Sequence, residues 1–117
     1  MSLFREGYIY RLCCARAWDG IARGDHIPYS PDDARDGFFH LSAPGQVIET
    51  ALKHYGEFEH LVAVGCPENA PGDLLKWEVS RGGAKFPHIH GDVMTAWFDH
   101  TVPLVRQGDT YVPVAHN

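Results

Sequence analysis

The sequence predicts an α+β fold, because both predicted helices lie in the first half of the chain and predicted strands dominate the second half. Strands and helices do not alternate regularly, as they would in a doubly wound parallel sheet. The chain has 117 residues, of which 44% are hydrophobic and 21% are charged. This size and composition are typical of one globular domain, which we expect to span residues 1–117.

The chain opens with a predicted strand followed by a predicted helix. Residues Tyr8 to Cys13 are rich in aromatic and β-branched side chains, which favour a strand. Apolar residues then recur at helical spacing from Ala15 to Ala22, before the stop at Gly24. The segment from Asp25 to Arg35 contains two prolines and is expected to be a loop without regular structure.

The segment from Asp36 to Ser42 predicts a strand that turns directly into the second helix. Its alternation places Phe38, His40 and Ser42 on one face and Phe39 and Leu41 on the other. Pro44 suits the first turn of that helix, whose apolar stripe continues to Tyr55.

Most of the second half of the chain reads as strands joined by turns. The predicted strands are Leu61 to Cys66, Leu74 to Ser80, Val93 to Phe98, Thr101 to Arg106 and Tyr111 to Val114. In the second of these, alternation places Leu75, Trp77 and Val79 on one face, and we expect Trp77 in the core. Arg81-Gly82-Gly83 predicts a flexible turn.

Composition argues against several classes of protein. The formal charge is −5 and the basic residues form no run, which argues against a DNA-binding surface. The three cysteines lack the spacing of a disulfide framework or a thiolate zinc site, so we expect free thiols in a cytoplasmic protein. No apolar run is long enough to predict a membrane span.

His40 and Ser42 are the first candidate site residues. His40 would either contact a ligand and act as a general acid–base, or bond to a neighbouring backbone group as a half-buried strand residue. Ser42 would either bind a ligand hydroxyl or cap the following helix. Both alternatives are open for each residue.

Four segments together resemble the bacterial domain-of-unknown-function family 952. They are Ile9-Tyr10-Arg11, Asp36-Gly37-Phe38-Phe39-His40-Leu41-Ser42, Leu75-Lys76-Trp77-Glu78 and Phe86-Pro87-His88-Ile89-His90-Gly91. The resemblance runs from about Tyr8 to about Val105. It implies a fold similar to that of the ADP-ribosyltransferases, a split and strongly bent, antiparallel-rich β-structure whose cleft holds NAD in the known enzymes. It does not supply an activity, because the family has none established.

On this resemblance, Glu78 becomes the candidate catalytic carboxylate, and His40 is the second candidate catalytic residue. A carboxylate beside the nicotinamide ribose would stabilise the developing cation, whereas the alternative is a solvated glutamate. Arg11 would neutralise a pyrophosphate or remain an edge charge, and Tyr10 would stack on a ring or lie in the core. His88 would be a polar ligand contact.

His88 and His90 also suggest a metal site, because alternate residues of a strand point the same way and imidazoles are common metal ligands. His40 could be a third ligand, but two histidines without a settled third ligand or carboxylate are a weak signal. We therefore predict that the chain holds no metal. The family usually has a tyrosine where this chain has His90.

The leading hypothesis is therefore a small protein that binds NAD or a related nucleotide and transfers or hydrolyses at the nicotinamide ribose. One alternative is a non-catalytic nucleotide-binding or other small-molecule-binding module, which Lys76 before Glu78 favours. A second alternative is a histidine-ligated, metal-dependent enzyme.

Overall fold

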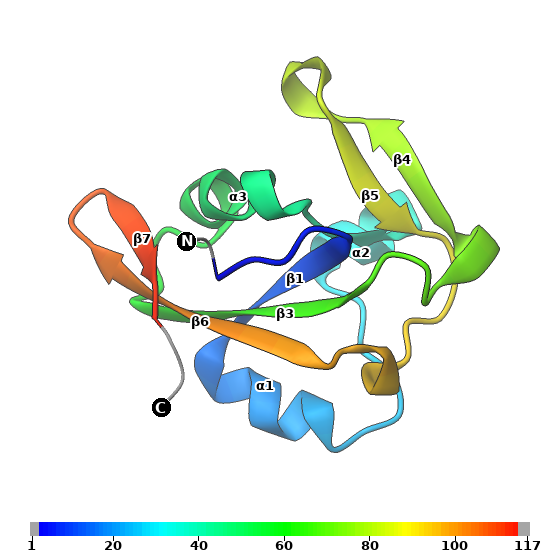
Figure 1. Ribbon diagram of the computed structural model, residues 1–117, viewed down its shortest axis with the longest axis horizontal. Helices are drawn as coiled ribbons and strands as arrows, with labels where there is room; N and C mark the ends of the chain where they lie inside the picture. The colour runs from blue at the N-terminus through cyan, green and yellow to red at the C-terminus, as the bar shows by residue number, and fades with distance from the viewer. Residues whose placement is uncertain (1–2, 115–117) are drawn as a thin grey trace.

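The computed structural model describes residues 3–114, which form two antiparallel sheets and three α-helices within that range (Figure 1). The first sheet has the strand order β1-β3-β6-β7 and the second has the order β2-β5-β4. The chain is thus α+β, as predicted. No helix among these residues is both long and apolar enough to cross a bilayer.

The four-stranded sheet forms the centre of the molecule. Its strands are β1 (Tyr8–Cys14), β3 (His60–Pro67), β6 (His100–Gln107) and β7 (Thr110–Pro113). The central strand β3 is apolar on both faces because helices cover both sides of the sheet, α3 (Val47–His54) on one and α1 (Ala15–Ala22) on the other (Figure 1). Alternation in β1 sends Tyr10 toward the α3 side and Ile9 into the opposite core cluster.

The three-stranded sheet is built on a hairpin that projects from this body (Figure 1). Its strands are β2 (Phe39–His40), β5 (Lys85–Ile89) and β4 (Leu75–Val79). One short contact joins it to the first sheet, a β-bridge between Tyr10 of β1 and Ser42, which lies just after β2. Within the second sheet, the Leu41 N–H donates to the Pro87 carbonyl. The two sheets therefore diverge from a shared point, and the space between them can hold a site.

The expected loop from Asp25 to Arg35 contains a helix, α2 (Pro31–Asp36), so this prediction was wrong. Pro31 occupies the first turn, where its missing N–H has no partner to lose. Ser30 caps the helix through a capping box with Asp33. Because α2 continues to Asp36, the predicted strand from Asp36 to Ser42 shrinks to β2.

Two other predictions fail in the second half of the chain. Val93 to Phe98 is not a strand, because Thr95–Trp97 forms a single turn of 3-10 helix. Trp77 does not lie in the core: its residue is 40% exposed, since β4 is an edge strand of the projecting hairpin. The three cysteines are free thiols, as expected, with only Cys66 fully buried.

Candidate functional site

A cleft of about 650 Å³ opens between the two sheets. Its walls come from β1, α2, β2, α3 and the β4–β5 hairpin. The volume lies within the range of about 300–1,000 Å³ that is typical of small-molecule sites. His40 and His88 both line it, with 5.3 Å between their ring centroids.

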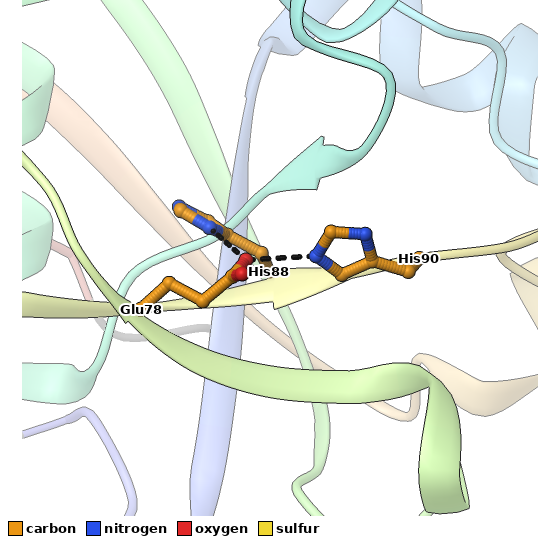
Figure 2. Close-up of side chains that lie close together, drawn as sticks. All are labelled: Glu78, His88 and His90. Atoms are coloured by element: carbon orange, nitrogen blue, oxygen red, sulfur yellow. Dashed lines mark hydrogen bonds and ion pairs between the residues drawn. The ribbon is translucent and has the colours of Figure 1, made fainter.

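Beside the cleft, one carboxylate oxygen holds two imidazoles (Figure 2). Oε1 of Glu78 lies 2.8 Å from Nδ1 of His88 and 2.7 Å from Nε2 of His90. His88 and His90 share a side because they alternate along the chain at the end of β5, and Glu78 comes from the adjacent strand β4. These hydrogen bonds hold the pKa of Glu78 below its usual value, with His90 contributing most.

His88 is the buried member of this group, and its second ring nitrogen faces the cleft. Burial lowers the pKa of His88, although Glu78 opposes this effect. Nδ1 then carries the proton that is donated to Glu78, and Nε2 keeps a lone pair. Within residues 3–114, no fully buried side-chain nitrogen or oxygen lacks a partner. Since Nε2 of His88 has no hydrogen-bond partner there, it reaches the accessible space of the cleft.

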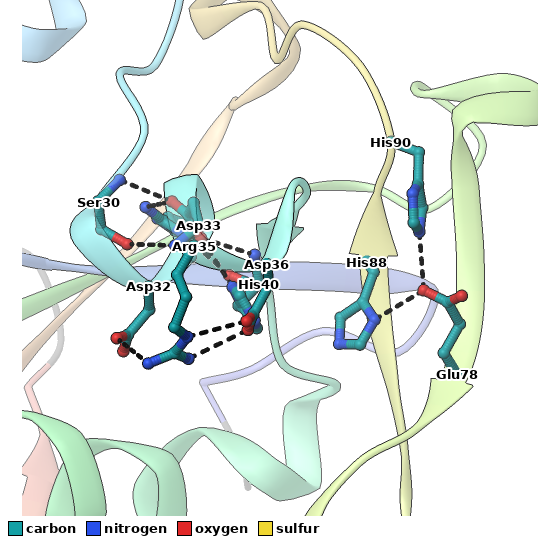
Figure 3. A network of polar contacts seen from close by, with 10 residues as sticks. Ser30, Asp32, Asp33, Arg35, Asp36, His40, Glu78, His88 and His90 are labelled. Atoms are coloured by element: carbon teal, nitrogen blue, oxygen red, sulfur yellow. Dashed lines mark hydrogen bonds and ion pairs between the residues drawn. The ribbon is translucent and has the colours of Figure 1, made fainter.

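A second polar network forms the opposite wall (Figure 3). The guanidinium of Arg11 forms two hydrogen bonds with the carboxylate of Asp33, at 3.1 and 2.5 Å, and a third with the carbonyl of His40 at 3.0 Å. Asp33 is fully buried and also accepts from the backbone N–H groups of Ser30 and His40. Burial raises the pKa of Asp33, but Arg11, His40 and Ser30 outweigh it and lower that pKa to about 2.

His40 is held between two carboxylates of this network. Its Nδ1 lies 2.8 Å from Oδ1 of Asp33, and its Nε2 lies 2.8 Å from Oδ2 of Asp36. Because an ionised carboxylate only accepts, both contacts form together when both ring nitrogens carry a proton. A ligand must therefore displace Asp36 before it can hydrogen-bond to His40.

Phe38 links the two walls. Its ring centroid lies 4.2 Å from that of His88 in a stacked arrangement, 4.8 Å from that of His40 and 4.9 Å from that of His90. These contacts restrain the three imidazole rings. Sequence reasoning did not single out Phe38, but the alternation that placed it on the face of His40 was the available signal.

The structure brings three of the predicted site residues together, namely His40, Glu78 and His88. Glu78, however, is not among the residues that line the cleft, because it lies behind His88. It therefore touches a ligand in the cleft only through His88. Asp33 and Asp36 were missed, and only the Ser30-to-Asp33 capping spacing signalled the first of them.

The other three predicted residues have protein partners. Tyr10 is fully buried and its hydroxyl accepts from the Arg5 N–H, so its ring packs in the core rather than against a ligand. Both terminal nitrogens of the Arg11 guanidinium hydrogen-bond to Asp33, so they are not available to bind a pyrophosphate. Ser42 is 3% exposed, and its hydroxyl donates to Thr50 at 3.2 Å instead of capping a helix.

The group best able to hold a metal ion among the described residues is Glu78, His88 and His90. One donor atom from each lies within 4.8 Å of the others. The set differs from the histidine set that the sequence offered as an alternative to the prediction of no metal, since Glu78 takes the place given there to His40.

Comparison with known proteins gives a family and a fold. A family described as "Protein of unknown function (DUF952)" matches residues 12–98. The chain is 35% identical to protein CC0527 from Caulobacter crescentus, a structural genomics target, over 92% of this chain and 93% of that one, and the crystal structure superposes with a TM-score of 0.78. The solution structure of the same protein gives 34% identity, 90% coverage of each chain and a TM-score of 0.76. No curated protein matches the chain.

Proposed function

Since the chain belongs to the DUF952 family, whose description assigns no function, we propose its function from the cleft: the protein binds a phosphate-bearing small molecule, NAD or a related nucleotide, and His88 acts on it. The observation that carries this proposal is Nε2 of His88, which Glu78 orients and which has no partner within residues 3–114. The proposal also draws on the sequence resemblance, which implies a fold similar to that of the ADP-ribosyltransferases.

His88 supplies the chemical group of the proposed site. With its proton on Nδ1, the ring presents Nε2 as an acceptor for a water or for a ligand hydroxyl. Glu78 is a positioning residue in this arrangement, because it fixes the tautomer and the orientation of the imidazole. The role expected for Glu78 from sequence, direct stabilisation of a developing cation, is not part of this proposal, because Glu78 does not line the cleft.

Two cations at the rim are available for phosphate. Lys53 pairs with Glu49, and Arg35 pairs with Asp32 and Asp36. The side chains of Lys53 and Arg35 are 53% and 64% exposed. Exposed ion pairs are worth only about 0–1 kcal/mol, so either cation can turn to a phosphate at low cost. The buried Arg11 cannot, because it would leave Asp33 uncompensated.

For an NAD-like ligand, the reaction we propose is transfer or hydrolysis at the nicotinamide ribose. Nε2 of His88 takes the proton of the attacking water or acceptor hydroxyl, whose oxygen bonds to C1′ of the ribose. The bond from C1′ to nicotinamide breaks, and neutral nicotinamide leaves with the bonding electrons. The alternative, a binding module without catalysis, uses the same cleft and predicts binding without release of nicotinamide. Release of nicotinamide from NAD therefore distinguishes an enzyme from a non-catalytic binding module.

The test begins with the melting temperature of the protein with NAD, ADP-ribose and nicotinamide at millimolar concentration. We expect NAD and ADP-ribose to raise it, since a ligand that binds only the folded state stabilises that state. Nicotinamide release should then fall by about 10²-fold or more in His88→Gln. Glu78→Gln, at a partly exposed position, provides a second variant if His88→Gln does not fold.

His54 provides the matched control, because it lines the same cleft without contacting Glu78 or His88. The variant His54→Gln should keep the release rate of the wild type. If neither NAD nor ADP-ribose raised the melting temperature, a nucleotide would be excluded as the ligand of the cleft. Release that persists in both His88→Gln and Glu78→Gln would exclude the pair as the acting group.

A further inference from the structure

We propose that Glu78, His88 and His90 form a binding site for one divalent transition-metal ion of the zinc class. Oε1 of Glu78, Nδ1 of His88 and Nε2 of His90 lie within 4.8 Å of one another. Within the described range 3–114, no other group of three metal-ligating side chains meets this spacing. The inference goes beyond the proposed function, because it concerns the side of His88 that faces away from the cleft.

The backbone places these donors before any ion arrives. His88 and His90 are alternate residues on one face at the end of β5, and Glu78 lies on β4, the hydrogen-bonded neighbour of β5 (Figure 2). Phe38 stacks on His88 and contacts His90, which restrains both rings. A preorganised pair of imidazoles loses little conformational entropy when it binds a metal.

The donor chemistry suits zinc. Two imidazoles and one carboxylate match a ligand set that holds catalytic zinc and leaves a fourth position for water. Imidazole also suits other divalent first-row ions, which the same experiment can rank. Lys76 lies opposite His88 in the strand register, but it is exposed and its long side chain can turn into solvent.

A bound ion requires a small opening of the group. Bonds of about 2.0–2.2 Å in a tetrahedral site place neighbouring donor atoms roughly 3.3–3.5 Å apart. The present separations of 2.8 and 2.7 Å are those of hydrogen bonds. The carboxylate of Glu78 must therefore withdraw by roughly 0.5 Å from each imidazole to reach zinc-like spacing. The two imidazole nitrogens, which lie within 4.8 Å of each other, must reach the same spacing. The side chain of Glu78 is 39% exposed, so packed protein does not enclose it on every side.

Metal at this site would change what the cleft presents to a ligand. With an ion on Nδ1, the proton of neutral His88 resides on Nε2. The group that faces the cleft then donates a hydrogen bond, whereas in the metal-free protein it accepts one. The metal thus changes Nε2 of His88 from a hydrogen-bond acceptor to a donor without moving the ring.

The test is a titration of the full chain, freed of metal with a chelator, by Zn²⁺ in the absence of nucleotide. Calorimetry should show one ion bound per chain. Glu78→Gln and His90→Ala should each weaken binding by about 100-fold or more, since loss of an outer-shell partner alone costs about 10–100-fold. Both positions are partly exposed, and circular dichroism will verify that the variants fold.

His60→Ala is the matched control, because His60 is an exposed histidine at the start of β3. It should bind Zn²⁺ as the wild type does. A Co²⁺ spectrum without a thiolate charge-transfer band should show that the cysteines are not ligands. The proposal is overturned by the absence of saturable binding, or by saturable binding that survives unchanged in Glu78→Gln and His90→Ala. Neither result bears on whether NAD or ADP-ribose binds, which the thermal shift decides.

Discussion

Nδ1 of His88 lies 2.8 Å from Oε1 of Glu78, and this contact leaves Nε2 of the same ring directed at the cleft. The carboxylate lies behind the imidazole rather than in the cleft, so Glu78 can affect a ligand only through His88. On the other wall His40 has both of its ring nitrogens engaged by Asp33 and Asp36. The cleft therefore holds two imidazoles in contrasting environments, one tied to carboxylates on both sides and one with an open nitrogen.

The pair Arg11 and Asp33 should be a major contributor to stability. Asp33→Asn leaves the buried guanidinium without a charged partner, and we expect unfolding free energy to fall by about 3–5 kcal/mol. Asp32→Asn is the control on the same helix, because the Asp32 side chain is 57% exposed, and its effect should stay within about 0.5 kcal/mol. Urea unfolding measures both. Equal effects of the two substitutions would show that the buried pair adds nothing.

The same pair should make stability depend on acid pH. The pKa of Asp33 is about 2 in the folded protein against an ordinary value of 3.8. Because the folded value is the lower one, ionised Asp33 stabilises the protein above about pH 4, and this contribution is lost as the pH falls to about 2. The difference corresponds to about 2 kcal/mol. The gap in stability between wild type and Asp33→Asn should therefore narrow across this range, and a constant gap would contradict the assignment.

Gly65 should not tolerate a side chain. A Cβ atom there would lie 2.6 Å from Cε1 of Tyr10, whose ring is fully buried against the central strand. We expect Gly65→Ala to destabilise the protein by about 1–3 kcal/mol through overpacking. In contrast, Gly20→Ala in α1 meets nothing within 4 Å and should stabilise by about 0.5–1 kcal/mol. Thermal unfolding of the two variants should shift in opposite directions.

Local sequence patterns predicted the central sheet well. Leu61 to Cys66 is apolar on both faces because helices cover both sides, and it forms the core of β3. The loop predicted around Pro31 was wrong, because this proline begins α2 instead of preventing a helix. Alternation alone placed Trp77 in the core, but burial also needs a covering layer, and the β4–β5 hairpin has none over that residue.

The site could be predicted only in part, because its contacts join distant segments. The pattern around His40 correctly set Phe38 and His40 on one face. The meeting of Glu78 with His88 and His90 depends on the register of β4 against β5, which pairs Glu78 with Phe86. No local pattern fixes that register. Asp33 escaped notice for the same reason, since its importance comes from Arg11, a partner 22 residues away.

The rim cations give the proposed ligand its phosphate contacts, and replacing them should weaken binding without unfolding the protein. Lys53→Met and Arg35→Met remove only exposed ion pairs, so stability should change by less than about 1 kcal/mol. Each substitution should weaken ADP-ribose binding by roughly tenfold, because a hydrogen bond to a charged group contributes about 1.5 kcal/mol. It should also reduce the dependence of that affinity on salt, since exposed charges are screened.

Calorimetry with ADP-ribose at two salt concentrations measures both effects. Arg16→Met on α1, an exposed arginine outside the cleft, should leave affinity and salt dependence unchanged. Nicotinamide itself carries no phosphate, so any affinity for it should be the same in all three variants. If Lys53→Met and Arg35→Met bind ADP-ribose as the wild type does, the phosphates do not lie at this rim.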